Sequence, residues 1–343
     1  MSQPSFSVII PTFNRARFLP EALDSVFIQG VADVQVIVVD DGSTDGTEAV
    51  IADYGHKHGH KIDYVRQENG GAAAARNTGL SMARGRLISF LDSDDLWVPG
   101  KMKAELSVFD NIASADAVIS DSERWMENEL VCRSWFEEQG LVMPENKPAP
   151  LPPMPPLWTR RKPFATCCLT ITHTALERLG QPSFDTSLPT HQDWDFVIRM
   201  IHSCKVIVLP DSTAIVRRFN DGTRVGRPLP GTPYPPAVKR VMAQRRYRIF
   251  EKAQNMKGWP DEVVPHIEQA RSEAAREFAD NLSGWRRRGL ARMVVGELQR
   301  GAYRSAAVVM ASGLAPAKVR SLFSSSARAK GRTHIATTTE RPS

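Results

Sequence analysis

Three aspartates within four residues, Asp92, Asp94 and Asp95, follow the apolar run 88–91. Carboxylates this close repel one another unless a cation or hydrogen bonds compensate their charge. Hard divalent ions such as Mg²⁺ and Mn²⁺ bind carboxylate oxygens and share their remaining positions with phosphates and water. The cluster therefore indicates a site for a divalent metal and a phosphate-bearing ligand. The alternative is a solvated acidic turn in which Asp95 caps a helix.

Two further polar segments follow predicted strands. Pro11, Thr12, Phe13 and Asn14 come after one apolar run, and the segment 40–43, Asp-Asp-Gly-Ser, comes after the next. Turns after strands are often Asp- and Gly-rich for conformational reasons alone. In an open parallel sheet, however, ligands bind at the carboxyl ends of the strands. Together with the aspartate cluster, the two segments predict one ligand site at that edge.

Other metal and phosphate sites fit the sequence poorly. A calcium-binding loop starting at Asp41 would need Glu at its twelfth position, which is Ala52. Neither a G-x-x-x-x-G-K-[ST] loop nor a G-x-G-x-x-G motif is present. His56, His58 and His60 have no Cys or acid cluster beside them, which favours a solvated loop.

A second pair of acids, Asp193 and Asp195, begins a predicted helix over 193–202. Residues two apart on a helix point in different directions, so both are not expected to address one substrate group. One acid should therefore be chemical and the other structural. Helical periodicity does not choose between them.

These residues are positioned by alternating strands and helices in the first 120 residues. Apolar runs of four to six residues alternate with segments of helical spacing. This order predicts an α/β fold with a mostly parallel central sheet and helices on both faces. The expected strands are 6–10, 34–39, 62–65, 87–91 and 116–120, and the expected helices are 19–27, 44–58 and 72–83.

Beyond Trp125 the pattern weakens. Eight prolines between Pro144 and Pro163 predict a loop or linker. Order is expected again over 166–172 and in a strand over 205–209, and helices are expected from Ala237 onward.

Charge divides the chain. The formal charge is +6, yet residues 285–332 hold 11 Lys and Arg against the single acid Glu297, which leaves −4 for the remainder. The acidic body argues against nucleic-acid binding, and the basic segment suggests an anionic surface. Within the segment, Leu290 and neighbouring apolar residues have helical spacing. This helix would pack on its own domain or attach peripherally to an anionic membrane.

Cysteines and hydropathy suggest a cytoplasmic location. The four cysteines include the adjacent pair Cys167 and Cys168 and form no CxxC pair, which argues against a disulfide framework. The N-terminus lacks the basic start and length of a signal peptide, and no stretch approaches the roughly 20 apolar residues of a membrane-spanning helix.

The motifs taken together resemble glycosyltransferase family 2. The likeness is specific over 5–101 and weaker through 192–195 to about 216. The segments that carry it are Ser7–Arg15, Val38–Asp45, Glu68–Gly71, Ala75–Asn77, Phe90–Asp95 with its D-x-D motif, and Gln192–Asp195.

The resemblance implies a GT-A fold and an inverting, metal-dependent transfer of a sugar, of the hexosyltransferase type. The donor is a nucleotide-diphosphate sugar, and the acceptor is a carbohydrate or a lipid-linked hydroxyl of polysaccharide or glycolipid assembly. It implies a GT-A domain over 1–225, with a nucleotide-sugar half to about 120 and an acceptor half over 121–225. A helical extension over 226–323 and a disordered tail over 324–343 complete the expected organisation.

The resemblance also assigns roles to residues. Asp193 would be the catalytic base, Asp92, Asp94 and Asp95 the candidate ligands of Mn²⁺ or Mg²⁺, and Arg76 would lie near the base or diphosphate. The remaining donor-binding residues would be Pro11, Thr12, Phe13, Asn14, Asp41 and Ser93.

Two positions depart from the family pattern. Gln192 stands where Glu is frequent, and Phe219 replaces a His often found near the diphosphate, a role that Arg217 or Arg218 would then take. The departures leave open a non-catalytic nucleotide-sugar binding module. A sugar nucleotidyltransferase is less compatible, because its glycine-rich basic loop is missing after the first strand.

Overall fold

The structure, a computed structural model, describes residues 3–59, 61–141, 143, 145, 147–152, 159, 164–188, 190–219 and 234–281. The chain divides into two compact units. The first comprises Met1–Val225 with Ala253–Ile267, and the second comprises Gly226–Lys252 with Glu268–Ser343. The first unit holds the sheet and all of the predicted site residues.

Four parallel strands form the first half of the sheet, in the order β3-β2-β1-β4. Their sequences are apolar runs without alternation because both faces of the sheet are covered. The strands are β1 (Phe6–Thr12), β2 (Val34–Asp40), β3 (Ile62–Arg66) and β4 (Leu87–Phe90).

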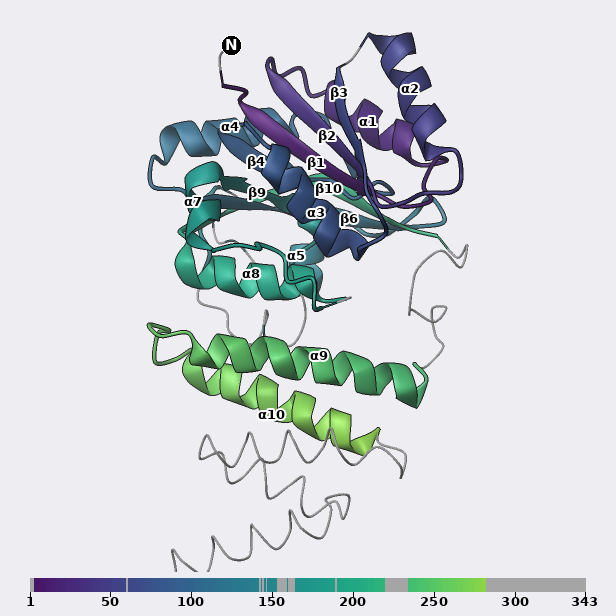
Figure 1. Cartoon of the computed structure of the whole chain (residues 1–343). Helices are drawn as coiled ribbons and strands as arrows, with labels where there is room; N and C mark the ends of the chain where they lie inside the picture. Colours follow the sequence, from purple (N-terminus) through teal and green to yellow (C-terminus); the bar gives the residue numbers. More distant parts are fainter. Residues whose placement is uncertain are drawn as a thin grey trace, which may run out of the picture. The chain divides into compact units, whose positions relative to one another are not determined.

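The order in which the chain passes through the strands puts helices on both faces of the sheet. From β1 to β3 the chain steps one way through α1 (Leu19–Phe27) and α2 (Thr47–His58), and α3 (Gly71–Met82) carries it back to β4. Right-handed crossovers therefore put α3 on the opposite face from α1 and α2, as Figure 1 shows. A Cβ on Gly79 of α3 would lie 2.4 Å from Ile9 Cγ2, so glycine permits this close packing.

The predicted start of α2 at Thr44 is wrong by three residues. Gly46 has a φ of 82°, and the helix begins at Thr47. The Asp45 carboxylate accepts bonds from the Thr47 hydroxyl at 2.5 Å and from the Ala16 amide at 3.0 Å. Asp45 thus holds residues 44–46 as a loop against the segment that follows β1.

The second half of the sheet is mixed. β9 (Leu169–Thr172) is antiparallel to both β4 and β6 (Ala117–Met126), and β6 pairs in parallel with β10 (Val206–Arg218). The expected mostly parallel α/β sheet is confirmed, but one antiparallel strand lies in its middle. Short antiparallel strands β5 (Leu96–Trp97), β7 (Glu129–Cys132) and β8 (Ala149–Pro150) add to its margins.

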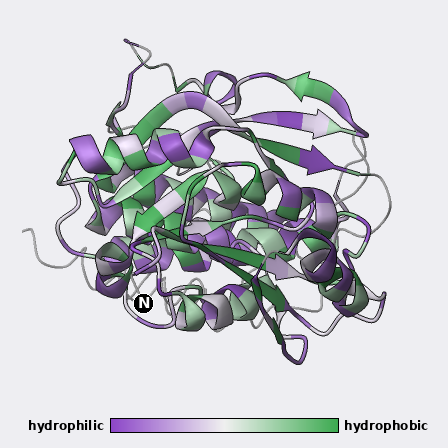
Figure 2. Ribbon diagram, turned by 90° about the horizontal axis from the view of Figure 1, so that it is seen from above, coloured by the Kyte–Doolittle hydropathy of each residue, from purple (hydrophilic) through white to green (hydrophobic). Residues whose placement is uncertain are grey.

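β6 and β10 are longer than predicted, because both strands continue beyond their apolar starts into polar residues. The predicted helix at 193–202 is α8 (Gln192–Ser203). Three unpredicted helices are α4 (Lys101–Asn111), α5 (Trp135–Glu138) and α7 (His173–Arg178). Figure 2 shows the strands mostly hydrophobic, whereas the helices carry hydrophilic residues as well.

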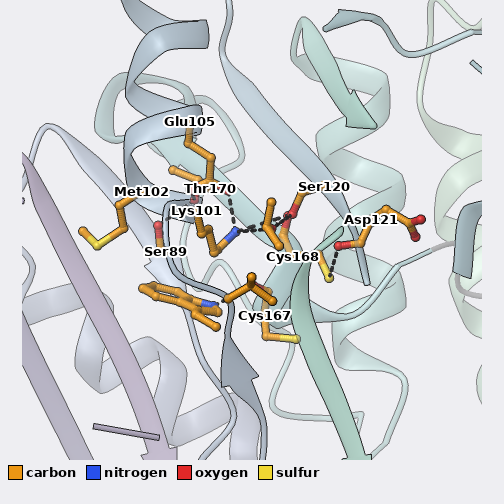
Figure 3. A network of polar contacts seen from close by, with 12 residues as sticks. Ser89, Lys101, Met102, Glu105, Ser120, Asp121, Cys167, Cys168 and Thr170 are labelled. Carbon is orange, nitrogen blue, oxygen red and sulfur yellow. Dashed lines mark hydrogen bonds and ion pairs between the residues drawn. The ribbon is translucent and has the colours of Figure 1, made fainter. Parts of the chain in front are cut away.

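α4 buries an ion pair in the core. The Lys101 ammonium lies 2.5 Å from a Glu105 carboxylate oxygen, and both side chains are fully buried. The other Glu105 oxygen accepts from Thr170 on β9 at 2.8 Å. Lys101 also lies 3.5 Å from the Ser120 hydroxyl on β6 and 3.4 Å from the Thr213 hydroxyl on β10. Figure 3 shows this network, which joins α4 to three strands.

Helices α9 (Pro236–Asn255) and α10 (Val264–Asp280) follow, in the part of the chain where helices are expected from Ala237 onward. Within the second unit, Arg246 of α9 pairs with Glu277 of α10. Residues 282–343, including the basic segment and the expected disordered tail, lie outside the described residues. Among the described helices, none is long and apolar enough to cross a membrane.

Candidate active site

Asp41 shapes the loop that leads into α3. Its carboxylate is buried and accepts from the Gln67 side-chain amide at 2.8 Å, the Gly70 amide at 2.9 Å and the Gly71 amide at 2.7 Å. Oδ1 takes two of these bonds and Oδ2 takes one. A carboxylate offers about four lone-pair sites, so Oδ2 retains capacity for one more donor such as a base N–H.

The end of β1 lies against the Asp41 loop. The Asp41 amide donates to the Thr12 carbonyl at 2.8 Å. Asn14, with a φ of 53°, donates its amide to the Ser43 hydroxyl at 2.9 Å, and its side-chain oxygen accepts from the Thr44 amide at 2.8 Å. The structure thus brings the predicted segments 11–14 and 40–44 together.

Two side chains of this segment suit a ligand. Phe13 is 43% exposed, so its ring presents a surface on which a planar base can stack. The Thr12 hydroxyl is buried and has no hydrogen-bond partner among the described residues. Pro11 lies within β1 and is buried there.

Arg76 of α3 is the central charge of the site. Its guanidinium lies 2.5 Å from Asp92, 3.5 Å from the Thr166 hydroxyl, and over the ring of Phe184 at 5.5 Å. Burial disfavours the charged form, but the negative charges of Asp92 and Asp193 outweigh burial and raise the pKa of Arg76. Asp92, at the end of the sheet, and Asp193, on α8, therefore act on one buried cation.

The three clustered aspartates have different surroundings. Asp92 pairs with Arg76, and Asp94 lies 3.7 Å from the Arg15 guanidinium. Asp95 is buried and accepts from the Arg217 amide at 2.9 Å, which fixes the turn to β10. The cationic compensation expected for this cluster is thus provided in part by two arginines.

A divalent metal still fits the donor set. Asp92 and Asp94 keep 33% and 16% of their side chains exposed, and their oxygens are the hard ligands that Mg²⁺ and Mn²⁺ prefer. Ser93 between them is buried. Within the described ranges, no three His, Cys, Asp or Glu side chains form a complete metal cage. An ion held here would need the phosphate oxygens of a ligand to complete its coordination.

The two acids of α8 have different surroundings. Asp195 is buried and pairs with Arg199 at 3.0 Å, and Arg199 donates in turn to the Leu179 carbonyl. Asp193 is half-buried, and its carboxylate accepts from the Trp194 amide at 2.9 Å. Asp195 thus organises α8, whereas Asp193 belongs to the electrostatic surroundings of Arg76.

Phe219 takes part in an aromatic and cationic cluster. Its ring stacks on Phe18 at 4.5 Å, and the Arg217 guanidinium lies 5.5 Å from Phe219 and 5.8 Å from Phe18. Arg217 also pairs with Glu21 of α1 and donates to the Asp94 carbonyl at 2.7 Å. Its guanidinium supports the aspartate turn, which differs from the phosphate-binding role considered for it.

Several contributors escaped the sequence reasoning. Arg15, Glu21 and Phe18 lie in or beside the first helix, and their spacing gave no chemical signal. Of the three, only Arg15 lies in a segment that resembles the family. Their contacts to Asp94 and Arg217 join positions far apart in the chain.

Residues 7–155 match the profile of Glycosyl transferase family 2. Residues 7–155 thus form a domain similar to glycosyltransferase family 2. An uncharacterized glycosyltransferase of Rickettsia felis is 30% identical over 224 residues, which cover 63% of this chain and 34% of that protein. The minor teichoic acid biosynthesis protein GgaB of Bacillus subtilis is 42% identical over 107 residues, which cover 31% of this chain and 12% of GgaB. The chain thus spans about a third or less of the length of these relatives.

Solved structures share the fold of this chain. S. aureus TarS 1–349 in complex with UDP-GlcNAc has a TM-score of 0.56 at 19% identity and covers 94% of this chain and 92% of that chain. Mannosyltransferase PcManGT from Pyrobaculum calidifontis, in complex with GDP-Man and Mn²⁺, has a TM-score of 0.54 at 21% identity and covers 95% and 85%. The expected GT-A fold is therefore confirmed.

Proposed function

We propose that this protein transfers a sugar from a nucleotide-diphosphate donor to an acceptor hydroxyl, with inversion and with the help of a divalent metal. The observation that carries the proposal is that Asp92 pairs with the buried Arg76 beyond the carboxyl end of β4, and that the negative charge of Asp193 also helps to raise the pKa of Arg76. The ligands named for TarS and PcManGT, UDP-GlcNAc and GDP-Man, support a nucleotide-sugar donor.

The donor site is assigned to the carboxyl ends of β1, β2 and β4. Phe13 would stack on the base and the Oδ2 atom of Asp41 would accept its N–H. Asp92 and Asp94 would hold the metal, with Asp95 securing their turn. When bound, Mn²⁺ or Mg²⁺ supplies positive charge for the departing diphosphate.

Asp193 would act as the general base. An acceptor hydroxyl is a weak nucleophile until a positioned carboxylate takes its proton, a contribution of about 10² to 10⁴ in rate. The acceptor oxygen bonds to the anomeric carbon, the carbon–oxygen bond to the diphosphate breaks with its electron pair on oxygen, and the proton passes to Asp193. Attack opposite the leaving group inverts the anomeric centre.

A panel of nucleotide sugars tests the proposal. Thermal shift with Mn²⁺ should reveal the donor, because a bound ligand raises stability as RT ln(1 + [L]/Kd). Slow donor hydrolysis with metal but without acceptor is then expected. A donor that binds and is never hydrolysed or transferred would favour a non-catalytic binding module, the alternative that Gln192 and Phe219 leave open.

Metal removal tests the role of Asp92 and Asp94. EDTA should abolish transfer, and added Mn²⁺ or Mg²⁺ should restore it, because the described side chains alone do not neutralise a departing diphosphate. Calorimetry of Mn²⁺ with and without the donor should show tighter binding with the donor present. Full activity in the presence of chelator would show that transfer does not need a metal.

A further inference from the structure

A second charged cluster lies in the acceptor half, around Arg124 of β6. The Arg124 guanidinium stacks on the ring of Trp135, with Cζ 4.1 Å from the ring centroid. Arg124 is only 8% exposed, and its Nε is buried without a hydrogen-bond partner among the described residues. The described residues provide no salt bridge to this guanidinium. A buried cation without a counter-ion lowers the stability of the fold. A negative partner beside Arg124 would compensate this cost.

Two neighbouring side chains also carry N–H groups that lack a hydrogen-bond acceptor among the described residues. Trp135 Nε1 and Gln139 Nε2 are buried and make no hydrogen bond within the described part of the chain. Gln139 follows Trp135 by one helical turn, and the backbone amide of Gln139 donates to the Trp135 carbonyl at 3.1 Å. All of the unpartnered atoms in this cluster are N–H donors, and each unmade bond costs about 1–3 kcal/mol. The missing partner must therefore be an acceptor of hydrogen bonds.

The nearby Asp121 does not fill this role. Its Oδ1 accepts from the Ser122 amide at 2.7 Å and from the Phe136 amide at 2.9 Å, so the carboxylate anchors α5. Burial raises the pKa of Asp121 despite these bonds, which lower it. The Asp121 carboxylate thus already accepts hydrogen bonds from backbone amides.

The cluster is connected to the proposed reaction centre. The short helix η1 (Thr166–Cys168) places the Thr166 hydroxyl 3.5 Å from Arg76. At its other end, the Cys168 thiol lies 3.9 Å from the Asp121 carbonyl, a contact visible in Figure 3. A chain of contacts through η1 and Asp121 thus links the strand that carries Arg124 to the surroundings of Arg76.

We propose that Arg124, with the N–H groups of Trp135 and Gln139, binds an oxyanion of the acceptor, so that the acceptor is an anionic glycan or glycolipid. A guanidinium presents a planar fork that matches phosphate and carboxylate oxygens, and its charge shortens and strengthens the bonds. The term acceptor rests on the proposed function, but the oxyanion site itself can be measured without any transfer.

Calorimetric titration of the full chain with inorganic phosphate, D-glucuronate and neutral D-glucose tests the site. A nucleoside diphosphate that binds the donor site is kept saturating, so that phosphate cannot bind there. Phosphate or glucuronate should bind while glucose does not, and the oxyanion that binds distinguishes a phosphate-bearing from a uronate-bearing acceptor. Arg124→Gln should weaken that binding at least about tenfold, because a charged, forked contact is lost.

Two variants make the result specific. Arg133→Gln removes the same charge from an exposed position and should leave oxyanion binding unchanged. Trp135→Phe keeps a ring beneath Arg124 but deletes one N–H, so binding should weaken by less than in Arg124→Gln. If Arg124→Gln does not fold, Trp135→Phe decides the matter.

The inference is overturned if neither oxyanion binds the wild-type chain, or if Arg124→Gln and Trp135→Phe bind as the wild type does. Donor binding, measured in the same preparations, reports separately on the proposed function. Failure to bind any nucleotide, together with Arg124-dependent oxyanion binding, would reject the transferase proposal and keep this site.

Discussion

Asp193 and Asp195 stand two residues apart on α8, and their environments divide their roles. Asp195 is buried against Arg199, which in turn secures the Leu179 carbonyl. Asp193 is half-buried and contributes to the field that keeps Arg76 charged. A proton acceptor must be reachable by substrate, which favours Asp193, whereas a buried, paired carboxylate contributes to stability.

Replacing each acid with Asn should separate the two roles. Asp193→Asn should lower transfer at least about a hundredfold while donor binding and folding persist, because only the proton acceptor is lost. Asp195→Asn should lower the free energy of unfolding by about 1–3 kcal/mol, since it removes the buried carboxylate that pairs with the half-buried Arg199. Initial rates, calorimetric donor binding and denaturant melts measure the three quantities. Near-normal transfer in Asp193→Asn with loss of transfer in a folded Asp195→Asn would reverse the assignment.

The aspartate turn shows how neighbouring residues of one type acquire different functions. Asp92 and Asp94 each face an arginine at the surface of the site, and Asp95 turns inward to the Arg217 amide. The side chains of Asp92 and Asp94 keep exposed oxygen surface, whereas Asp95 is buried. We therefore expect Asp92 and Asp94 to contact metal and donor and Asp95 to hold the turn.

At the scale of elements, α4 is the longest of the described helices that periodicity missed. Its inward positions include Lys101 and Glu105, which a sequence pattern reads as solvent-exposed. Both are buried because they pair with each other and because hydroxyls of three strands surround them. A hydrophobic pattern does not detect a helix whose buried face carries a matched pair of charges.

Removing one partner of the Lys101–Glu105 ion pair should lower the free energy of unfolding more than replacing both partners with apolar residues. Glu105→Gln leaves a buried ammonium without its counter-charge and should reduce the free energy of unfolding by about 3–5 kcal/mol. The double variant Lys101→Met with Glu105→Leu removes both charges and should be closer to wild type. Lys103→Met, at an exposed position of α4, serves as the control and should change little. Urea denaturation measures the free energy of unfolding of each variant. A double variant less stable than Glu105→Gln would contradict this account.

At the scale of the whole chain, charge is unevenly distributed. The basic segment 285–332 carries a formal charge of +10 against −4 for the rest of the chain, and it lies outside the described residues. Its attachment to a membrane remains a prediction from charge and helical spacing. Each basic residue near an anionic bilayer contributes about 1 kcal/mol, which makes such attachment strongly dependent on lipid charge.

Truncation before Trp285 should therefore abolish binding to anionic vesicles. The full chain should co-sediment with vesicles that contain phosphatidylserine or phosphatidylglycerol and not with phosphatidylcholine alone, and binding should weaken in high salt. The truncated chain should retain donor binding, since the predicted donor residues precede residue 100. Equal sedimentation of the two chains would locate any membrane contact elsewhere.

The sequence by itself determined the fold class and the family, because both depend on local patterns. Buried strands appear as apolar runs, and polar segments that follow parallel strands must meet at one edge of the sheet. The motifs from Pro11 to Asp94 thus indicated the fold and one nucleotide-sugar site, although their individual roles remain proposals.

Only the tertiary structure decided which distant residues share an environment. Arg15 lies beside Asp94, Arg217 supports the aspartate turn, and Arg124 stacks on Trp135. The antiparallel β9 between β4 and β6 likewise left no trace in the order of elements. Electrostatic pairing and burial depend on contacts across the chain, and no local spacing encodes them. For that reason the partners of the charges, and the lack of a hydrogen-bond partner for Arg124 Nε among the described residues, became visible only in three dimensions.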